Sequence, residues 1–322
     1  MAERAQFERL EAWVNAQVLG QERLVRRLLV ALLADGHLLV EGVPGLAKTR
    51  VIRVLAAGIE GTFQRIQFTP DLLPADITGT EVFQPEQGTF VFQKGPVFHN
   101  FILADEINRA PAKVQSALLE AMAERQVTVG GHTWPLDEPF LVMATQNPIE
   151  QEGTYPLPEA QRDRFLLHVR VDYPDPEHEL EMLKLVRDQM RSGVRTIRPE
   201  RIHLSRRNIL AARKAVLDLH MAEALERYLV ALVGASRDPT PYDPELARWI
   251  AFGASPRGSI ALDLAARAHA WLAGRDHVSP EDVLEVVHDA LRHRILPSYD
   301  AEAEGVDSDR IIDRLLAAVP LP

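Results

Sequence analysis

The sequence predicts an α/β domain built on a parallel sheet, followed by a smaller all-α domain. Apolar strand candidates recur between helical patterns, at 38–41, 63–68, 100–104, 140–144 and 165–171. Strands that alternate with helices indicate a parallel sheet covered on both faces. After about residue 172 the strand pattern stops and helix follows helix. We therefore expect an α/β domain over residues 1–190 and an all-α domain over residues 200–322.

Local signals mark where the helices begin. Phe7, Leu10 and Val14 recur at helical spacing, which predicts an amphipathic helix at the N-terminus. A second helix is expected from about residue 21 to residue 34, directly before the first strand. In the second half, Ser279 is typical of an N-cap, and Pro280 would occupy the first helical position.

The composition is that of an ordinary globular chain, with 46% apolar and 25% charged residues among 322. A formal net charge of −10 argues against a surface built for wrapping nucleic acid. The absence of cysteine excludes disulfide bonds and thiolate metal sites. The N-terminus lacks the apolar core of a signal peptide, and no apolar run reaches membrane-spanning length. We therefore expect a cytoplasmic protein with no membrane span.

Residues 42–49 have the arrangement of a phosphate-binding loop, because they follow a short apolar strand and open a helix. Glycines let backbone N–H groups turn toward phosphate oxygens, and the helix N-terminus favours negative charge. Lys48 is expected to reach the β- and γ-phosphates of ATP, and the Thr49 hydroxyl to ligate Mg²⁺. Alanine replaces the second glycine of the usual pattern, and its small side chain is compatible with a helix start. The loop residues are Gly42, Val43, Pro44, Gly45, Leu46, Ala47, Lys48 and Thr49.

A pair of carboxylates ends a later apolar strand, at Asp105 and Glu106. The carboxyl ends of parallel strands meet at one edge of a sheet, so this pair is expected beside the phosphate loop. Asp105 would hold Mg²⁺, and Glu106 would orient and polarise the attacking water.

Three further polar residues fit a phosphoryl-transfer site. Asn147 ends another apolar strand, where its amide could hydrogen-bond the γ-phosphate or the water; a turn before Pro148 is the alternative. Arg164 precedes the last strand and could stabilise charge on the phosphate of a neighbouring subunit, with Arg162 as the second choice. Arg257 lies at a loop-to-helix junction, where a salt bridge within the helical domain is the alternative.

Together these motifs resemble the AAA+ ATPases, and within them the MoxR family. The resemblance runs from about Trp13 to Arg294 and implies a P-loop ATPase core followed by an all-α lid. In MoxR proteins the second glycine of the loop is commonly alanine, and the position of Arg162 is usually apolar, which favours Arg164 as the arginine finger. The motifs are Gly42–Thr49, Ala104–Ala110, Val114–Met122, Ala144–Pro148, Leu157–Phe165 and Gly253–Gly258.

The resemblance also implies a role for each candidate residue. Val18, Leu19 and Gly20 would pack against adenine, and Gln67 would restrain the second carboxylate as a polar switch residue. The remaining roles are Walker A for Lys48 and Thr49, Walker B for Asp105 and Glu106, sensor 1 for Asn147, and sensor 2 for Arg257.

Two insertions are similar to those of a clade that includes MoxR proteins, magnesium-chelatase motor subunits and MCM helicases. Residues from about 80 to 95 match the helix-2 insert, and those from about 126 to 136 match the hairpin before sensor 1. In this clade the lid is repositioned, so Arg257 could serve the nucleotide of its own subunit or of a neighbour.

The function implied is chaperone-like remodelling of protein complexes, driven by ATP hydrolysis in a homo-hexamer. A protein with a von Willebrand factor A domain is the implied partner. A nucleic-acid motor of the MCM type is one alternative, but it needs basic hairpins, and the first insert carries Glu81, Glu86 and a single Lys94. The other alternative is a binding module gated by nucleotide with slow turnover.

Overall fold

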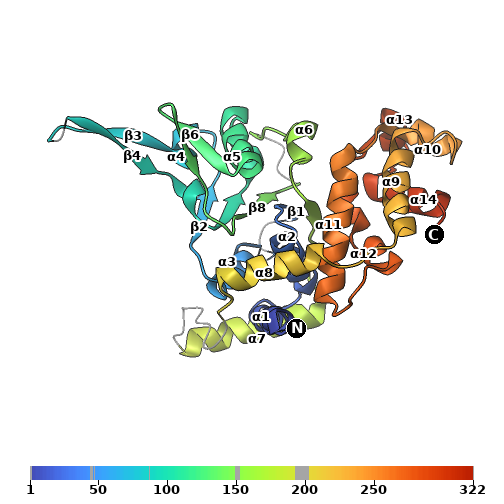
Figure 1. The fold of residues 1–322 in the computed structure, drawn as a ribbon, viewed down its shortest axis with the longest axis horizontal. Helices are drawn as coiled ribbons and strands as arrows, with labels where there is room; N and C mark the ends of the chain where they lie inside the picture. Colours follow the sequence, from blue (N-terminus) through green and yellow to red (C-terminus); the bar gives the residue numbers. More distant parts are fainter. Residues whose placement is uncertain are drawn as a thin grey trace. The chain divides into compact units, whose positions relative to one another are not determined.

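The computed structural model describes residues 2–43, 46, 48–86, 88–148, 153–192 and 203–321. Five strands form one sheet in the order β2–β5–β8–β1–β9 (Figure 1). The pairs β2–β5, β5–β8 and β1–β8 are parallel, which confirms the predicted α/β class. The strands are β1 (Leu38–Glu41), β2 (Phe63–Gln67), β5 (Phe101–Asp105), β8 (Leu141–Gln146) and β9 (Leu167–Arg170).

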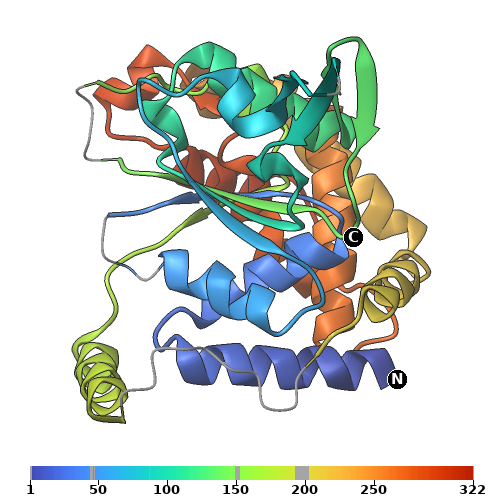
Figure 2. The same cartoon turned by 90° about the vertical axis from the view of Figure 1, so that its left-hand side faces the viewer.

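Helices lie on both sides of this sheet (Figures 1 and 2). On one side are α2 (Glu22–Leu33) and α3 (Lys48–Ala57), with α1 (Ala2–Gln17) beyond them. On the other side are α4 (Pro74–Thr78) and α5 (Ala112–Glu124). The central strands β5 and β8 are largely apolar and are buried except at their last residues, because both of their faces are covered.

The strand register brings polar chain ends to one edge of the sheet. Gln67, at the end of β2, is the register partner of Asp105, at the end of β5. Glu41, at the end of β1, is the partner of Gln146, at the end of β8. Ligands bind outside this carboxyl edge in open α/β sheets.

Two antiparallel hairpins extend the sheet domain. The first joins β3 (Gly79–Gln84) to β4 (Thr89–Lys94) and projects away from the sheet (Figure 1). The second joins β6 (Gln126–Val129) to β7 (His132–Pro135) and turns at two glycines with positive φ, Gly130 and Gly131. The first hairpin follows α4 directly, and the second follows α5. Short 3₁₀ turns, η1 (Pro96–Phe98) and η2 (Ile107–Arg109), flank β5.

The chain divides into two compact units, Met1–Leu157 with Val169–Leu210, and Pro158–His168 with Ala211–Pro322. The boundary expected between residues 190 and 200 falls largely on 193–202, outside the described residues. The first unit also holds α7 (Pro176–Ser192), and α8 (Arg206–Leu217) crosses the division. None of the helices in the described ranges is long and apolar enough to cross a membrane.

The second unit is helical apart from the start of β9 and a two-stranded antiparallel pair, β10 (Ile250–Phe252) with β11 (Leu296–Pro297). Its helix α12 begins at Pro280 after Ser279, as predicted. The helices are α6 (Glu159–Arg162), α9 (Glu223–Arg237), α10 (Pro244–Trp249), α11 (Pro256–Leu272), α12 (Pro280–Leu291), α13 (Tyr299–Ala303) and α14 (Ser308–Ala318).

A buried carboxylate joins two of these helices. Asp282, in the first turn of α12, is fully buried and accepts hydrogen bonds from His269 Nδ1 at 2.7 Å and from the backbone N–H of Ser279 at 2.9 Å. Arg275 also pairs with it. Burial alone would raise the pKa of Asp282, but the hydrogen bonds from His269, Arg275 and Ser279 outweigh it and lower the pKa to about 2.

Asp282→Ala should lower the free energy of unfolding of this unit by about 3 kcal/mol, because it leaves the Arg275 charge without its buried partner. The folded-state pKa lies below the ordinary value, so the contribution is present above about pH 4 and is lost as the pH falls toward about 2. Denaturant unfolding of wild type and variant across this range measures both effects.

The matched control is Asp276→Ala, because the Asp276 side chain is 98% exposed and pairs with His277 at the surface. Its effect should stay below about 0.5 kcal/mol at every pH. Equal effects of the two substitutions would contradict the role given to Asp282.

Candidate nucleotide site

A cavity of about 530 Å³ opens at the carboxyl edge of the sheet. Its wall comes from the end of α1, the start of α3, the ends of β5 and β8, and one side of α7. The cavity brings together eight residues singled out from the sequence, namely Val18, Leu19, Leu46, Lys48, Thr49, Asp105, Glu106 and Asn147.

Other residues predicted to bind the nucleotide lie outside this wall or outside the described residues. Gly20, Gly42 and Val43 are described but do not line the cavity. A Cβ at Gly42 would lie 2.6 Å from the carbonyl oxygen of Val171, the residue after β9. The backbone at Val171 therefore leaves no room for a side chain at Gly42. Pro44, Gly45 and Ala47 lie outside the described residues.

Lys48 opens α3, and its ammonium group donates a hydrogen bond to the Gly42 carbonyl at the start of the loop. Burial lowers the pKa of Lys48, and the carboxylates of Asp105, Glu106 and Glu41 act in the opposite direction. A partly buried cation beside a helix N-terminus attracts anions. This end of the cavity therefore suits phosphate groups.

The two carboxylates at the end of β5 have separate partners. Asp105 Oδ2 accepts hydrogen bonds from Arg65 at 3.0 Å (Nε) and 2.6 Å (Nη2). Glu106 Oε2 accepts from Gln67 Nε2 at 2.9 Å and pairs with Arg109 Nε at 3.1 Å. The predicted contact between Gln67 and Glu106 is therefore present in the structure.

The backbone keeps these carboxylates apart. Glu106 has φ +57° and ψ +51°, the left-handed region that non-glycine residues adopt at a steric cost. Its N–H donates to the Thr145 hydroxyl at 2.9 Å, and the same hydroxyl donates to Asp105 Oδ1 at 2.7 Å. Thr145 thereby holds both members of the pair.

Sequence reasoning missed Thr145, Arg65 and Arg109 as members of the site. Thr145 is the buried residue two positions before Asn147, so it resembles an ordinary core position of a strand. Arg65 precedes Gln67 by two residues on β2 and therefore shares its face, which is the signal that could have revealed it. Arg50 and Arg53 on α3 also line the cavity.

The donor atoms suit magnesium. Thr49 and Asp105 both line the cavity and offer a hydroxyl and a carboxylate, which are hard oxygen ligands. No group of three His, Cys, Asp or Glu in the described part of the chain could hold a metal ion unaided. Mg²⁺ commonly takes one or two protein oxygens and completes its shell with phosphates and water, so this donor set fits a nucleotide-bound ion.

Part of the cavity wall is apolar. Val18 and Leu19, after α1, face the same space as Met182, Leu185 and Val186 of α7. An apolar slot next to a phosphate-binding end accommodates a planar base. The cavity wall thus combines groups that suit the phosphates of a nucleotide with groups that suit its base.

The arginines predicted to act on phosphate lie in the second compact unit. Arg164 is exposed, whereas Arg162 is half-buried and its buried Nε has no hydrogen-bond partner among the described residues. Arg257 Nη1 lies 3.7 Å from Asp163 Oδ2, so it forms an ion pair within the second compact unit, with a partner from outside the range predicted for the helical domain. The Arg257 side chain remains 57% exposed.

The fold and this site define an ATPase of the AAA class. Residues 37–167 match the family model described as ATPase family associated with various cellular activities, and residues 247–315 match the AAA lid domain. The crystal structure of a candidate ATPase from Cytophaga hutchinsonii superposes with a TM-score of 0.92 and 47% identity, covering 100% of this chain and 96% of that one.

The relatives narrow the class. Chaperone MoxR1 of Mycobacterium tuberculosis is 50% identical over 99% of this chain and 82% of its own length. Protein MoxR of Paracoccus denitrificans is 36% identical over 99% of this chain and 97% of its own. The chain belongs to the MoxR family of AAA+ ATPases.

Thr145→Val should lower ATP turnover by about tenfold, because loss of the hydroxyl frees Asp105 and the Glu106 backbone while leaving the volume unchanged. Thr145→Ser keeps the hydroxyl and should retain most of the turnover. Steady-state ATPase assays of the three proteins give the comparison. Wild-type turnover in Thr145→Val would exclude this residue from positioning the carboxylates.

Proposed function

We propose that this chain is a Mg²⁺-dependent ATPase motor that remodels protein complexes. Lys48 and Thr49 would bind the phosphates and the ion, with Asp105 as the second protein ligand of Mg²⁺. The ion would neutralise charge that develops on the phosphate oxygens. Glu106 would orient and deprotonate the attacking water, and Asn147 would position that water or the γ-phosphate.

The contact between Gln67 and Glu106 carries the remodelling part of the proposal. Gln67 ends β2, and only residues 68–78 separate it from the projecting β3–β4 hairpin. A change at Glu106 on nucleotide binding or hydrolysis would alter its hydrogen bond to Gln67 and so reach the base of that hairpin. The site and the hairpin would therefore move together.

The hairpin carries an apolar surface suited to protein. Phe83 and Phe90 pair near its end with ring centroids 5.2 Å apart, and their side chains are 50% and 67% exposed. Val82 and Val91 are exposed on the opposite face. Exposed apolar patches of this kind mark contacts with other proteins. The name of the relative Chaperone MoxR1 agrees with this function.

The second hairpin gives no support to a nucleic-acid motor. Arg125, at its base, donates to the Phe140 carbonyl at 2.7 Å and to the Asp35 carbonyl at 2.6 Å, so it braces the fold. Trp134 stacks on Phe92 of the first hairpin at 4.9 Å between ring centroids. The two hairpins are thereby joined through packed rings, without a basic track along a phosphate backbone.

The assembly proposed is the one that MoxR membership implies. It is a cytoplasmic homo-hexamer in which Arg164 of one subunit reaches the nucleotide of the next, and its partner carries a von Willebrand factor A domain. Arginine fingers supplied between subunits make hydrolysis depend on assembly.

Glu106→Gln should bind ATP with nearly unchanged affinity and hydrolyse it at least about a hundredfold more slowly, because Asp105 and Lys48 remain while water activation is lost. Nucleotide binding is measured with a fluorescent ATP analogue, and turnover by phosphate release. Unchanged turnover would remove Glu106 from the reaction and with it the proposed mechanism.

Phe90→Ser together with Phe83→Ser should weaken the remodelling activity several-fold and leave basal ATP turnover within about twofold of wild type, since neither side chain lines the nucleotide cavity. Light scattering of a heat-unfolded model enzyme, with and without ATP, measures the chaperone activity. Full protection by the double variant would show that protein binding occurs elsewhere.

A further inference from the structure

The segment Pro158–His168, which carries Arg164, is built into the helical unit. Three consecutive side chains that follow α12 hold its carbonyl groups. Arg292 Nη1 donates to the His168 carbonyl at 2.6 Å, and His293 Nε2 donates to the Phe165 carbonyl at 3.1 Å. Burial and the neighbouring Arg294 lower the pKa of His293 well below its ordinary value, so the ring is neutral and donates through Nε2.

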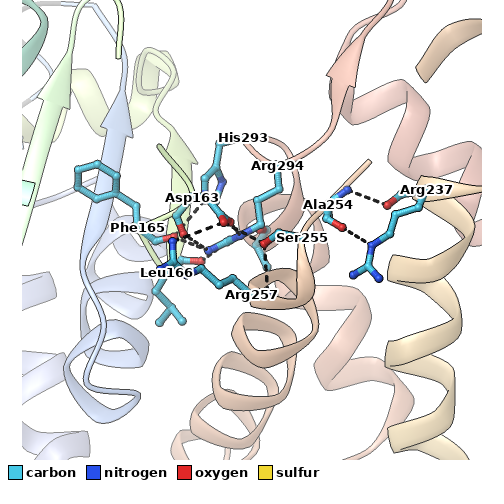
Figure 3. Close-up of polar contacts among 11 residues, drawn as sticks. Asp163, Phe165, Leu166, Arg237, Ala254, Ser255, Arg257, His293 and Arg294 are labelled. Atoms are coloured by element: carbon cyan, nitrogen blue, oxygen red, sulfur yellow. Dashed lines mark hydrogen bonds and ion pairs between the residues drawn. The ribbon is translucent and has the colours of Figure 1, made fainter. Parts of the chain in front are cut away.

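Arg294 makes the largest set of these contacts. Its Nη1 donates to the Leu166 carbonyl at 3.1 Å, and its Nη2 donates to the carbonyls of Phe165 at 2.7 Å and Asp163 at 3.1 Å (Figure 3). The Arg294 side chain is only 3% exposed. A buried guanidinium with several fixed acceptors has one preferred geometry, so the backbone around Arg164 is held firmly.

Asp163 connects this anchor to the start of α11. Its Oδ1 accepts from Arg294 Nε at 2.7 Å, and its Oδ2 accepts from the Ser255 hydroxyl at 2.9 Å (Figure 3). The Ser255 hydroxyl in turn accepts from the backbone N–H of Arg257 at 3.1 Å, as the N-cap of α11. The Arg257 guanidinium lies 3.7 Å from the same Oδ2.

The loop before α11 is fixed independently. A Cβ at Gly253 would collide with the backbone of Ser236, so only glycine allows this approach. Ala254 N–H donates to the Ser236 hydroxyl at 2.9 Å, and Arg237 Nε donates to the Ala254 carbonyl at 2.6 Å (Figure 3). The backbone before Ser255 is therefore fixed, and this fixes the position from which the Ser255 hydroxyl donates to Asp163.

We propose that Asp163 is a positioning residue for ATP hydrolysis, which holds Arg164 and Arg257 as one assembly. Arg164 is the next residue in the chain, and Arg257 pairs with the Asp163 carboxylate directly and through Ser255. One partly buried carboxylate thus sets the separation between two exposed cations, so both reach phosphate together or neither does. The inference rests on the proposed function, because it takes Arg164 and Arg257 to act on the phosphates.

A double-mutant cycle in the full chain tests this proposal. Asp163→Ala should lower kcat for ATP by about tenfold and change KM by less than about threefold. The double variant Asp163→Ala/Arg257→Ala should have nearly the same kcat as the single variant with the lower kcat, because both residues act through one assembly. If the fold-loss in kcat of the double variant equals the product of the two single fold-losses, the proposal is wrong.

Asp243→Ala is the matched control. Asp243 lies in the same unit, caps the N-terminus of α10 by accepting from the Glu245 N–H at 2.9 Å, and pairs with Arg314 at 2.5 Å. Its loss should lower the melting temperature as Asp163→Ala does, with kcat within about twofold of wild type. An equal fall in kcat for both variants would reduce Asp163 to a structural role and overturn the proposal.

The single variants Arg164→Ala and Arg257→Ala separate the positioning role of Asp163 from the proposed roles of the two arginines. If both lower kcat while Asp163→Ala does not, the positioning role is wrong and the proposed function stands. If neither lowers kcat, the proposed roles of the arginines fail and the positioning role fails with them.

Discussion

The nucleotide site depends on the hydroxyl of Thr145. This one oxygen donates to Asp105 and accepts from the backbone N–H of Glu106, and both bonds cross between neighbouring parallel strands. Adjacent carboxylates repel each other, and the left-handed backbone at Glu106 is sterically unfavourable. The Thr145 hydroxyl offsets both costs through these two bonds, and the roles proposed for Asp105 at Mg²⁺ and for Glu106 at the attacking water depend on it.

Each carboxylate is then connected to a different part of the molecule. Asp105 pairs with Arg65, and its charge also acts to raise the pKa of Lys48. We therefore assign this half of the site to nucleotide binding. Glu106 contacts Gln67, which precedes the projecting hairpin in the chain, so the proposed coupling of hydrolysis to remodelling involves that half. Arg164 and Arg257 belong to the helical unit and are joined through Asp163. The proposed roles in nucleotide binding, in coupling to the hairpin and in supplying the arginines therefore fall to residues in different parts of the fold.

The sequence predicted the fold, and it singled out eight residues that line one cavity, because these features follow from local pattern. Apolar runs such as Leu38–Val40 and Phe101–Ala104 are buried on both faces, and a polar residue at the end of such a strand must lie at the sheet edge. The hydrogen-bond partners of these residues were not predictable where they come from distant parts of the chain. Arg65 meets Asp105 only because β2 and β5 pair, and Asp163 meets Ser255 and Arg294 across 92 and 131 residues. No local pattern contains such contacts.

The central claim is that one subunit binds the nucleotide and another supplies the arginine. Mixing Lys48→Ala chains with Arg164→Ala chains and measuring ATP turnover tests this directly, because each variant alone lacks one half of every site. In a random equal mixture about a quarter of the interfaces would contain both intact halves, so turnover should recover toward about a quarter of wild type. Turnover that stays at the level of the separate variants, in a mixture shown to co-assemble, would contradict a site shared between subunits.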